Sequence, residues 1–555
     1  SVESAGDVDL LPDDAVALRM HSVGGWGAIT TGKNLALTCH ELLGLHVKAN
    51  PKYGSEKKGQ PTTFYATLSK EPVRMNGELK HVHVVLAPDP NVFRHSDPLA
   101  GLANGGVFVI QSDREPAELW RSLPAKARRA IVERGIRFYA LDGFRIASDE
   151  AGDPELRYRM QGAAFMGAFF AASRLAERHG LDQARLMDGI RAQMQEKFGK
   201  LGQGVVDDNV RVIRRGYDEL REVAPVEVAD EPPPAAARPI PAVLDVEEAE
   251  EGPGNPGRFF EQTCSIYAAG EEPIADPFVA ISAIPAATSA VRDMTHIRFE
   301  VPEFRPELCT GCAQCWTQCP DAAIPGLVST VDELIDTALR TAARTAPVDR
   351  VRQIAKHLAK EARKTVGAVA GTPFGDAMAA AYAAVADRLG WDPEKRAELD
   401  REFARVHAIL ADVQVARTQP FWDALERKEK GSGGLLSITI NPEACKGCNI
   451  CVDVCPEQAL VTVRQDEETV DTLRRRWKFW EALPDTADAF INVGDVEEGI
   501  GVLPSLLLKK QTYRSMAGGD GACMGCGEKT TVHLVVSAIE ALMQPRVKKF
   551  VGDLD

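Results

Sequence analysis

Two copies of one cysteine motif constrain this chain more than any other feature. The first copy occupies residues 309–320 and the second residues 445–456, and each reads C-x2-C-x2-C-x3-C-P. Three cysteines at this spacing can surround one metal cluster, whereas the fourth, followed by proline, is directed to the other cluster of a pair. The repeat therefore predicts two clusters shared between the two halves of one domain.

The predicted ligation is crossed between two 4Fe-4S clusters. One cluster is assigned Cys309, Cys312, Cys315 and Cys455, and the other Cys319, Cys445, Cys448 and Cys451. Zinc is the alternative, but a tetrahedral zinc site needs only paired C-x2-C groups and leaves the third and fourth cysteines of each copy unexplained. We therefore expect a two-cluster bacterial ferredoxin-like domain that accepts and passes single electrons.

Size and charge narrow the class of protein further. At 555 residues and 60.2 kDa the chain is too long for one core, so several domains are expected. A formal net charge of -15, with no dense basic run interleaved with aromatic residues, argues against a nucleic-acid partner. No apolar stretch is long enough to span a membrane, and residues 1–9 lack the features of a secretory signal. We expect a cytoplasmic protein.

The use of cysteine agrees with a reducing compartment. Ten of the twelve cysteines fall in C-x2-C groups, which suit metal ligation better than a disulfide framework. The remaining two, Cys39 and Cys264, stand alone, and we interpret both as small buried hydrophobic residues.

Residues 1–222 are predicted to form a Rossmann-like α/β domain. Apolar runs indicate strands that end at Val23 and that cover 82–87, 107–110 and 138–141, with helices at 30–42 and around 163–178. After this domain the composition changes to prolines, alanines and an acidic patch, which are typical of a linker.

The remaining segments are assigned from composition and periodicity. The order is a linker at 223–258, an irregular connector at 259–300, the ferredoxin domain at 301–325 and 436–465, a helical insertion at 326–435, a connector at 466–512 and a last domain that starts at 513. Apolar residues in the insertion recur at helical spacing, for example Val331, Leu334 and Ile335. Such stripes are typical of a core, so no chemistry is assigned to the insertion.

A third cysteine group lies in the stretch from Gly519 to Glu528, which contains C-x2-C-G-E. This sequence after a two-cluster ferredoxin domain resembles the start of the thiamine-diphosphate domain of 2-oxoacid:ferredoxin oxidoreductases, such as pyruvate:ferredoxin oxidoreductase. The resemblance implies that Cys523 and Cys526 are ligands of a third, proximal 4Fe-4S cluster and that Glu528 contacts thiamine diphosphate. A zinc half-site or an idle C-x2-C is the alternative.

The N-terminal region resembles the gamma domain of the same family, through residues 23–34 and 53–59. That domain helps to bind coenzyme A, which implies contacts from Gly24, Gly25, Trp26, Gly27, Ala28 and Lys57. A glycine-rich turn at a helix N-terminus offers backbone N–H groups and a positive dipole end to phosphates, and Lys57 and Lys58 add charge. The alternative for each residue of the turn is a plain tight turn, and the alternative for the lysines is a solvated side chain.

Two further motifs are interpreted as coincidences. Residues 27–33 match G-x4-G-K, but Asn34 stands where a P-loop needs Ser or Thr to hold magnesium. Residues 519–521 resemble the G-D-G that begins a thiamine–magnesium motif, yet no Asn follows before Asp555 to complete it.

The predicted fold class is multidomain α/β and α+β: a Rossmann-like gamma domain, a two-4Fe-4S ferredoxin-like domain with a helical insertion, and the start of a thiamine-diphosphate-binding α/β domain. The resemblance implies oxidation of a 2-oxoacid, most simply pyruvate, with coenzyme A to acyl-coenzyme A and CO2. A non-catalytic iron–sulfur subunit, or a relative specific for 2-oxoglutarate or indolepyruvate, remains the alternative.

The implied cofactors are three 4Fe-4S clusters, thiamine diphosphate and Mg, with coenzyme A as a substrate. The implied partners are ferredoxin or flavodoxin and the missing thiamine and substrate domains, in a homodimer or larger assembly. Ser1 is not Met, and Cys523 with Cys526 supplies only part of a cluster's ligands. We therefore expect the natural polypeptide or a partner to extend beyond Asp555. No catalytic residue is assigned.

Overall fold

The structure is a computed structural model, and it describes residues 11–52, 61–75, 77–151, 157–227, 255–268, 278, 280, 293–368, 371–491, 500–510, 512–513 and 527–554. The chain divides into two compact units. The first contains Ser1–Pro239 and Ser265–Ile274, and the second contains Ile240–Cys264 and Ala275–Asp555.

The first unit is built on a mixed sheet with the strand order β2-β3-β1-β4-β5-β6-β7. Strands β1, β4, β5 and β6 are parallel, whereas β2, β3 and β7 pair antiparallel. The strands are β1 Val16–Val23, β2 His46–Lys52, β3 Pro61–Ser69, β4 Val82–Ala87, β5 Leu102–Gln111, β6 Arg137–Leu141 and β7 Arg221–Glu222. The parallel centre agrees with the predicted α/β fold, while the hairpin of β2 and β3 was not expected.

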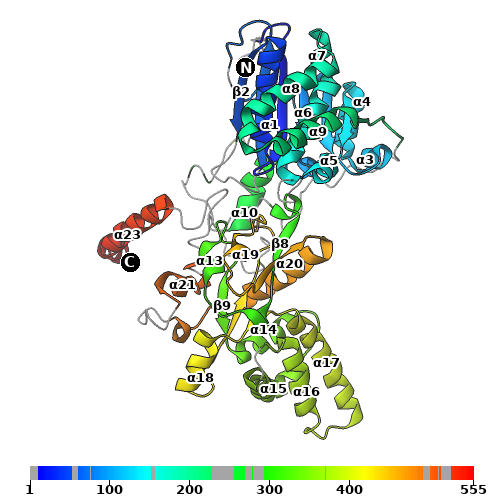
Figure 1. Cartoon of the computed structure of the whole chain (residues 1–555). Helices are drawn as coiled ribbons and strands as arrows, with labels where there is room; N and C mark the ends of the chain where they lie inside the picture. Colours follow the sequence, from blue (N-terminus) through cyan, green and yellow to red (C-terminus); the bar gives the residue numbers. More distant parts are fainter. Residues whose placement is uncertain are drawn as a thin grey trace. The chain divides into compact units, whose positions relative to one another are not determined.

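Helices cover both faces of this sheet, because its central strands are apolar on both sides. Val84 and Leu86 belong to one core and Val85 to the other. The first core includes residues of α1 Ala28–Leu43, α6 Arg157–Ser173, α8 Gln183–Phe198 and α9 Gln203–Asp218, which lie together in Figure 1. The second core includes residues of α3 Pro116–Ser122 and α4 Ala125–Glu133.

The helix expected around residues 163–178 is interrupted. Helix α6 ends at Ser173, and Arg174 takes a left-handed backbone conformation with φ of 52° before the short helix α7, Leu175–Arg178. The prediction was wrong at this boundary because apolar and alanine residues continue through it without a glycine or proline that marks the break.

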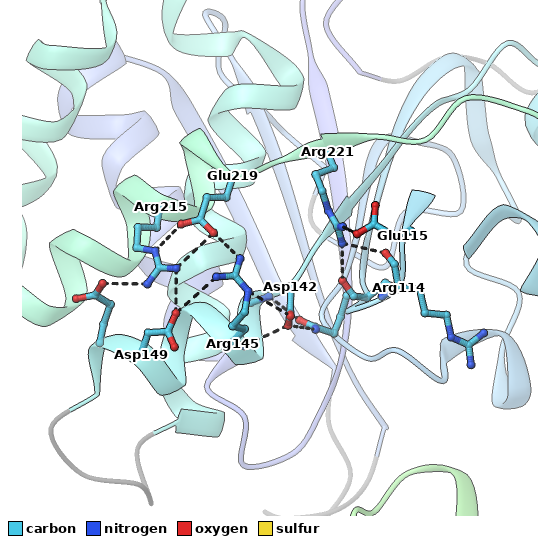
Figure 2. Close-up of polar contacts among 12 residues, drawn as sticks. Arg114, Glu115, Asp142, Arg145, Asp149, Arg215, Glu219 and Arg221 are labelled. Carbon is cyan, nitrogen blue, oxygen red and sulfur yellow. Dashed lines mark hydrogen bonds and ion pairs between the residues drawn. The ribbon is translucent and has the colours of Figure 1, made fainter. Parts of the chain in front are cut away.

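An ion-pair network ties α9 to α5, Gly143–Glu150 (Figure 2). Arg215 Nε lies 2.5 Å from Glu219 Oε1, and Arg215 Nη2 lies 3.1 Å from Asp149 Oδ2. Arg145 Nη2 lies 2.6 Å from Glu219 Oε2. Asp142 caps α5 by accepting a hydrogen bond from the Arg145 N–H.

The second unit contains two similar halves. The first half runs from β8, Glu300–Phe304, through α13, Gln314–Gln318, to β9, Gly326–Ser329. The second runs from β11, Leu435–Ile438, through α19, Ile450–Asp453, to β12, Leu460–Arg464. The first strand of each half pairs antiparallel with the last strand of the other, since β8 pairs with β12 and β11 with β9. This exchange relates the halves by a pseudo-twofold arrangement.

The predicted helical insertion consists of helices in the part of 330–411 that the structure describes (Figure 1). They are α14 Val331–Ala343, α15 Asp349–Ala368, α16 Phe374–Ala386 and α17 Pro393–Ala411. A capping box of Thr330 and Glu333 starts α14. The insertion shares one hydrophobic core with both ferredoxin-like halves, so it is packed onto them.

Segments expected to be connectors also contain helices. Helix α20, Glu467–Ala482, buries Trp477 and Trp480, so the expected connector at 466–512 is partly a structural element. Short helical turns occupy the described residues 256–268. Helix α21 is Val502–Leu506 and helix α23 is Gly527–Leu554. Within the described residues, no helix has the length and apolar character that crossing a membrane requires.

Candidate functional site

The eight motif cysteines line two separate cavities in the second unit. One cavity is lined by Cys309, Cys312, Cys315 and Cys455. The other is lined by Cys319, Cys445, Cys448 and Cys451. Each set joins three cysteines of one motif to the fourth cysteine of the other, which is the grouping that the spacing predicts.

The two cysteine loops share an unusual backbone. The second copy begins at Cys445, 136 residues after Cys309, and three left-handed positions recur at this offset. The equivalent pairs are Gly311 with Gly447, Ala313 with Asn449, and Ala322 with Gln458. Left-handed residues turn the chain sharply, and non-glycine residues adopt this conformation only where the surroundings hold them. The two loops therefore share the same sequence of left-handed turns.

The two crossing cysteines also receive equivalent backbone hydrogen bonds. The Ala323 N–H donates to Cys319 Sγ over 3.2 Å, and the Ala459 N–H donates to Cys455 Sγ over 3.2 Å. Hydrogen bonds to cysteine sulfur stabilise negative charge there and help to set the potential of an iron–sulfur cluster.

Burial raises the pKa of several of the motif thiols, so these are poor acids in the protein alone. It raises the pKa of Cys309 to about 12 and the pKa of Cys319 to about 12, and it raises the pKa of Cys315 well above its usual value. Cluster ligands are thiolates, so a cationic iron core would supply the charge that holds these sulfurs deprotonated. Among the described residues, no three His, Cys, Asp or Glu side chains are grouped closely enough to bind a single metal ion. Four cysteines line each cavity, which is the number of thiolate ligands that a 4Fe-4S cubane takes.

Buried charges surround the Cys445 loop. Lys446 Nζ lies 3.1 Å from Asp321 Oδ2, and both side chains are almost fully buried. Arg298 Nη1 donates to the carbonyl oxygens of Pro442 and Cys445. Glu443, also buried, accepts a 2.8 Å hydrogen bond from Arg474 Nε. Sequence analysis missed these residues, because nothing local in the sequence distinguishes a buried charge from a solvated one.

The glycine turn after β1 forms one wall of a cavity of about 740 Å³ in the first unit. The Trp26 N–H donates to the Val23 carbonyl, and the left-handed Gly27 is the N-cap of α1. Of the predicted coenzyme A contacts, Gly24, Gly25, Gly27 and Ala28 line this cavity. Its other walls come mainly from α6, α8 and α9, and include Met160, Met166, Met194, Phe198 and Ile213.

The other predicted site residues either do not line this cavity or lie outside the residues that the structure describes. Trp26 is buried and packs edge-on against Phe144, with ring centroids 5.2 Å apart. Lys57, Cys523 and Cys526 lie outside the described residues, as does the side chain of Cys264. Glu528 lies in α23, and its side chain is outside the description.

Two expectations about the first helix can be checked directly. Asn34, which replaces the P-loop Ser or Thr, is a buried residue of α1 whose Oδ1 accepts a 2.5 Å hydrogen bond from Lys197 Nζ. Cys39 is fully buried in the first core, which confirms its interpretation as a small hydrophobic residue.

Two parts of the chain match known protein families. Residues 17–219 match the family described as pyruvate ferredoxin/flavodoxin oxidoreductase, and residues 437–460 match a 4Fe-4S binding domain. The chain therefore contains a domain of that oxidoreductase family and a 4Fe-4S ferredoxin domain, and its relatives are pyruvate:ferredoxin or pyruvate:flavodoxin oxidoreductases.

Three relatives illustrate the extent of the similarity. A putative pyruvate-flavodoxin oxidoreductase of Synechocystis is 21% identical over 94% of this chain and 35% of its own length. Pyruvate:ferredoxin oxidoreductase of Moorella thermoacetica is 22% identical over 96% of this chain and 36% of its own length. The gamma subunit common to the pyruvate and ketoisovalerate oxidoreductases of Pyrococcus furiosus is 25% identical over 37% of this chain and 96% of its own length. The chain thus spans about a third of the two larger relatives.

Proposed function

We propose that this chain is part of a 2-oxoacid:ferredoxin oxidoreductase, which converts a 2-oxoacid and coenzyme A to acyl-coenzyme A and CO2 and passes electrons to ferredoxin or flavodoxin. The observation that carries the proposal is the crossed grouping of eight cysteines around two cavities, in a chain that also contains the oxidoreductase family domain. Pyruvate is the proposed 2-oxoacid, because the relatives that cover most of this chain act on pyruvate by name.

The cysteine cavities support a role in electron transfer. Cys309, Cys312, Cys315 and Cys455 are proposed to hold one 4Fe-4S cluster, and Cys319, Cys445, Cys448 and Cys451 the other. When bound, such clusters supply one-electron redox chemistry. The protein's part is to hold the two sites within one small domain and to limit the access of water to them. Three of the eight cysteines are buried, four are partly buried and Cys312 is exposed.

The cavity beside the glycine turn supports a coenzyme A site in the first unit. Its volume of about 740 Å³ is within the range of small-molecule sites, roughly 300–1,000 Å³. Its methionine, phenylalanine and isoleucine walls suit the apolar parts of such a ligand. Phosphates would lie at the turn, where the N-terminus of α1 offers unpaired backbone N–H groups. Val23 pairs with Pro61, so the chain that carries Lys57 re-enters the sheet beside this turn.

The thiamine part of the proposal depends on residues outside the described structure. Cys523 and Cys526 are proposed as partial ligands of a proximal 4Fe-4S cluster, and Glu528 as a contact of thiamine diphosphate. Thiamine, Mg and substrate contacts beyond these would come from domains elsewhere in the polypeptide or in another subunit. We further propose a cytoplasmic homodimer or larger assembly.

Ala28→Leu, in the complete enzyme, tests the coenzyme A site and the activity together. Leucine here would fill part of the cavity without altering Gly27, whose φ of 83° makes any substitution at that residue strained. The assay is anaerobic, coenzyme A-dependent oxidation of pyruvate with ferredoxin as acceptor. We expect the KM for coenzyme A to rise about tenfold, the equivalent of ~1.4 kcal/mol of lost binding, with the KM for pyruvate unchanged.

Leu37→Gln is the matched control, because Leu37 is an exposed residue of the same helix and lies away from the cavity. An unchanged KM in Ala28→Leu would remove the cavity from the proposal. Absence of any coenzyme A-dependent 2-oxoacid oxidation in the complete enzyme, with clusters present, would favour the non-catalytic electron-transfer subunit. Activity on 2-oxoglutarate or indolepyruvate in place of pyruvate would correct the substrate.

A further inference from the structure

A buried ion pair joins the two halves of the ferredoxin-like domain beside one cluster cavity. Lys446 Nζ lies 3.1 Å from Asp321 Oδ2 and 3.3 Å from Asp321 Oδ1. The side chains are 6% and 8% exposed, respectively, so water screens them little.

Both charges line the same cavity as Cys319, Cys445, Cys448 and Cys451. Lys446 directly follows Cys445, and Asp321 lies two residues after Cys319, so the ion pair crosses between the halves as the cysteine grouping does. The two charges thus reach the cavity with opposite sign.

The other cavity has no equivalent pair. At the offset of 136 residues, Thr310 corresponds to Lys446 and Glu457 corresponds to Asp321. Thr310 carries no charge, and Glu457 lines the Cys309 cavity but is exposed to solvent, which screens its charge. The domain is therefore nearly symmetric in backbone and cysteines but asymmetric in buried charge.

We propose that the Lys446–Asp321 pair sets the reduction potential of the cluster held by Cys319, Cys445, Cys448 and Cys451, and leaves its pseudo-symmetric partner unaffected. A cluster gains one negative charge on reduction. A buried cation stabilises the reduced form and raises the potential, whereas a buried anion does the opposite. This inference rests on the proposed 4Fe-4S clusters, and it names residues that tune one of them.

If the Lys446–Asp321 pair acted only in folding, the two single variants would have a different pattern of effects. The cost of removing two charges from water largely offsets their attraction, so a buried ion pair is weak evidence for stability. Loss of either partner leaves an unpaired buried charge and destabilises the fold in both cases. Opposite shifts in potential from the two single variants would not follow from such a structural role.

The experiment is a redox titration of the intact, anaerobically reconstituted chain, followed by electron paramagnetic resonance. Lys446→Met should lower the potential of one cluster and Asp321→Asn should raise it. We expect the ratio of reduced to oxidised cluster at a fixed potential to change about tenfold in each case, which corresponds to ~59 mV for a one-electron couple. The double variant should lie between the two. The shifted signal should be the one that Cys319→Ala removes.

Thr310→Val and Glu457→Gln are the matched controls at the equivalent positions, and both should leave the two potentials unchanged. If Lys446→Met fails to assemble its cluster, the proposal is tested by the sign of the shift in reduction potential in Asp321→Asn and in the double variant. Shifts of the same sign in both single variants, or intact spectra with no shift, would overturn the proposal. Absence of both cluster signals from the wild-type chain would instead refute the proposed clusters themselves.

Discussion

At the residue scale, the fourth cysteine of each motif lines the cavity of the other motif. Cys319 lines the cavity of Cys445, Cys448 and Cys451, and its sulfur accepts the Ala323 N–H. The pairing of β9 with β11 places the end of the first half beside the start of the second, which carries Cys319 across. The long insertion between the halves costs little, because loop-closure entropy grows only with the logarithm of length, by about 0.6 kcal/mol per doubling.

Cys319→Ala should therefore damage the cluster of the Cys445 cavity and spare the cluster of the Cys309 cavity. Iron-edge anomalous-scattering maps of the variant would show which site loses its iron, and iron content per chain would give the extent. The Cys39→Ala variant is the control, because Cys39 is buried in the other unit. Loss of iron from the Cys309 cavity with the Cys445 cavity intact would mean that each motif ligates its own cluster.

The equivalent glycines of the two loops differ in their surroundings. Gly447 and Gly311 are both left-handed, with φ of 66° and 80°. A Cβ at Gly447 would lie 2.5 Å from the Glu300 carbonyl oxygen, which is backbone and cannot move freely. A Cβ at Gly311 would lie 3.2 Å from side-chain atoms of Pro420 and Thr418.

Gly447→Ala should consequently be more harmful than Gly311→Ala. In both substitutions the left-handed conformation costs about 1–2 kcal/mol, but only Gly447→Ala adds a clash with the backbone. We expect the melting temperature of the holoprotein and its iron content to fall more in Gly447→Ala. Equal losses in the two variants would show that the backbone conformation alone controls both positions.

At the scale of elements, ion pairs join α5 to α9 in the first unit (Figure 2). Arg215 and Glu219 are neighbours on α9, and Arg215 also reaches Asp149 of α5. The hydrogen bond from Arg215 lowers the pKa of Glu219 below its usual 4.5, although burial opposes this shift. A carboxylate with a lowered pKa adds stability above its unfolded pKa and loses it as the pH falls through the folded pKa.

A double-mutant cycle of Arg215→Met and Glu219→Gln should give a coupling of about 0.5–1 kcal/mol at pH 7, the range of partly exposed pairs. The coupling should hold above about pH 4.5 and disappear as the pH falls through the lowered pKa of folded Glu219, because protonated Glu219 no longer attracts Arg215. Chemical unfolding of the four proteins at pH 7 and at successively lower pH measures it. A coupling that persists in acid would indicate packing between the side chains instead.

At the scale of the whole molecule, the chain contains separate hydrophobic cores. Two cores belong to the sheet domain at residues 17–223, and another joins the ferredoxin-like halves to the helical insertion at residues 260–513. A ligand stabilises the unit that binds it, by an amount set by its concentration relative to its dissociation constant. Iron should therefore stabilise one unit selectively.

Calorimetry should show two unfolding transitions. Only one of them should differ in temperature between the holoprotein and the protein stripped of iron. A shift of more than about 2–4 °C is expected, since ~1 kcal/mol moves the transition of a domain of this size by that amount. Fluorescence of Trp477 and Trp480, which are buried in α20, would help to assign the transition that moves to the second unit. Equal shifts of both transitions would show that the two units unfold together.

Several elements were predictable from local patterns, and others were not. The run at residues 82–87, apolar except for the exposed His83, is strand β4, because a nearly continuous apolar run suits a strand buried on both faces. Helix α16 lies within the predicted helical insertion, but no apolar stripe marked it individually, since the alanines of residues 374–386 lie on all of its faces and give little contrast between them. The hairpin of β2 and β3 contains Pro51 and Pro61, which weaken the local strand signal.

The cysteine spacing by itself predicted that three cysteines of each motif share a cavity, because ligands a few residues apart in one loop can reach a common point. The fourth cysteine, followed by proline, indicated the exchange between the motifs. Only the tertiary structure decided what surrounds them. Lys446 and Asp321 are 125 residues apart, and the walls of the cavity beside Gly27 come from four helices. Burial and choice of partner depend on chain segments far apart in sequence, so no local pattern can determine the charges and surfaces that adjust each site.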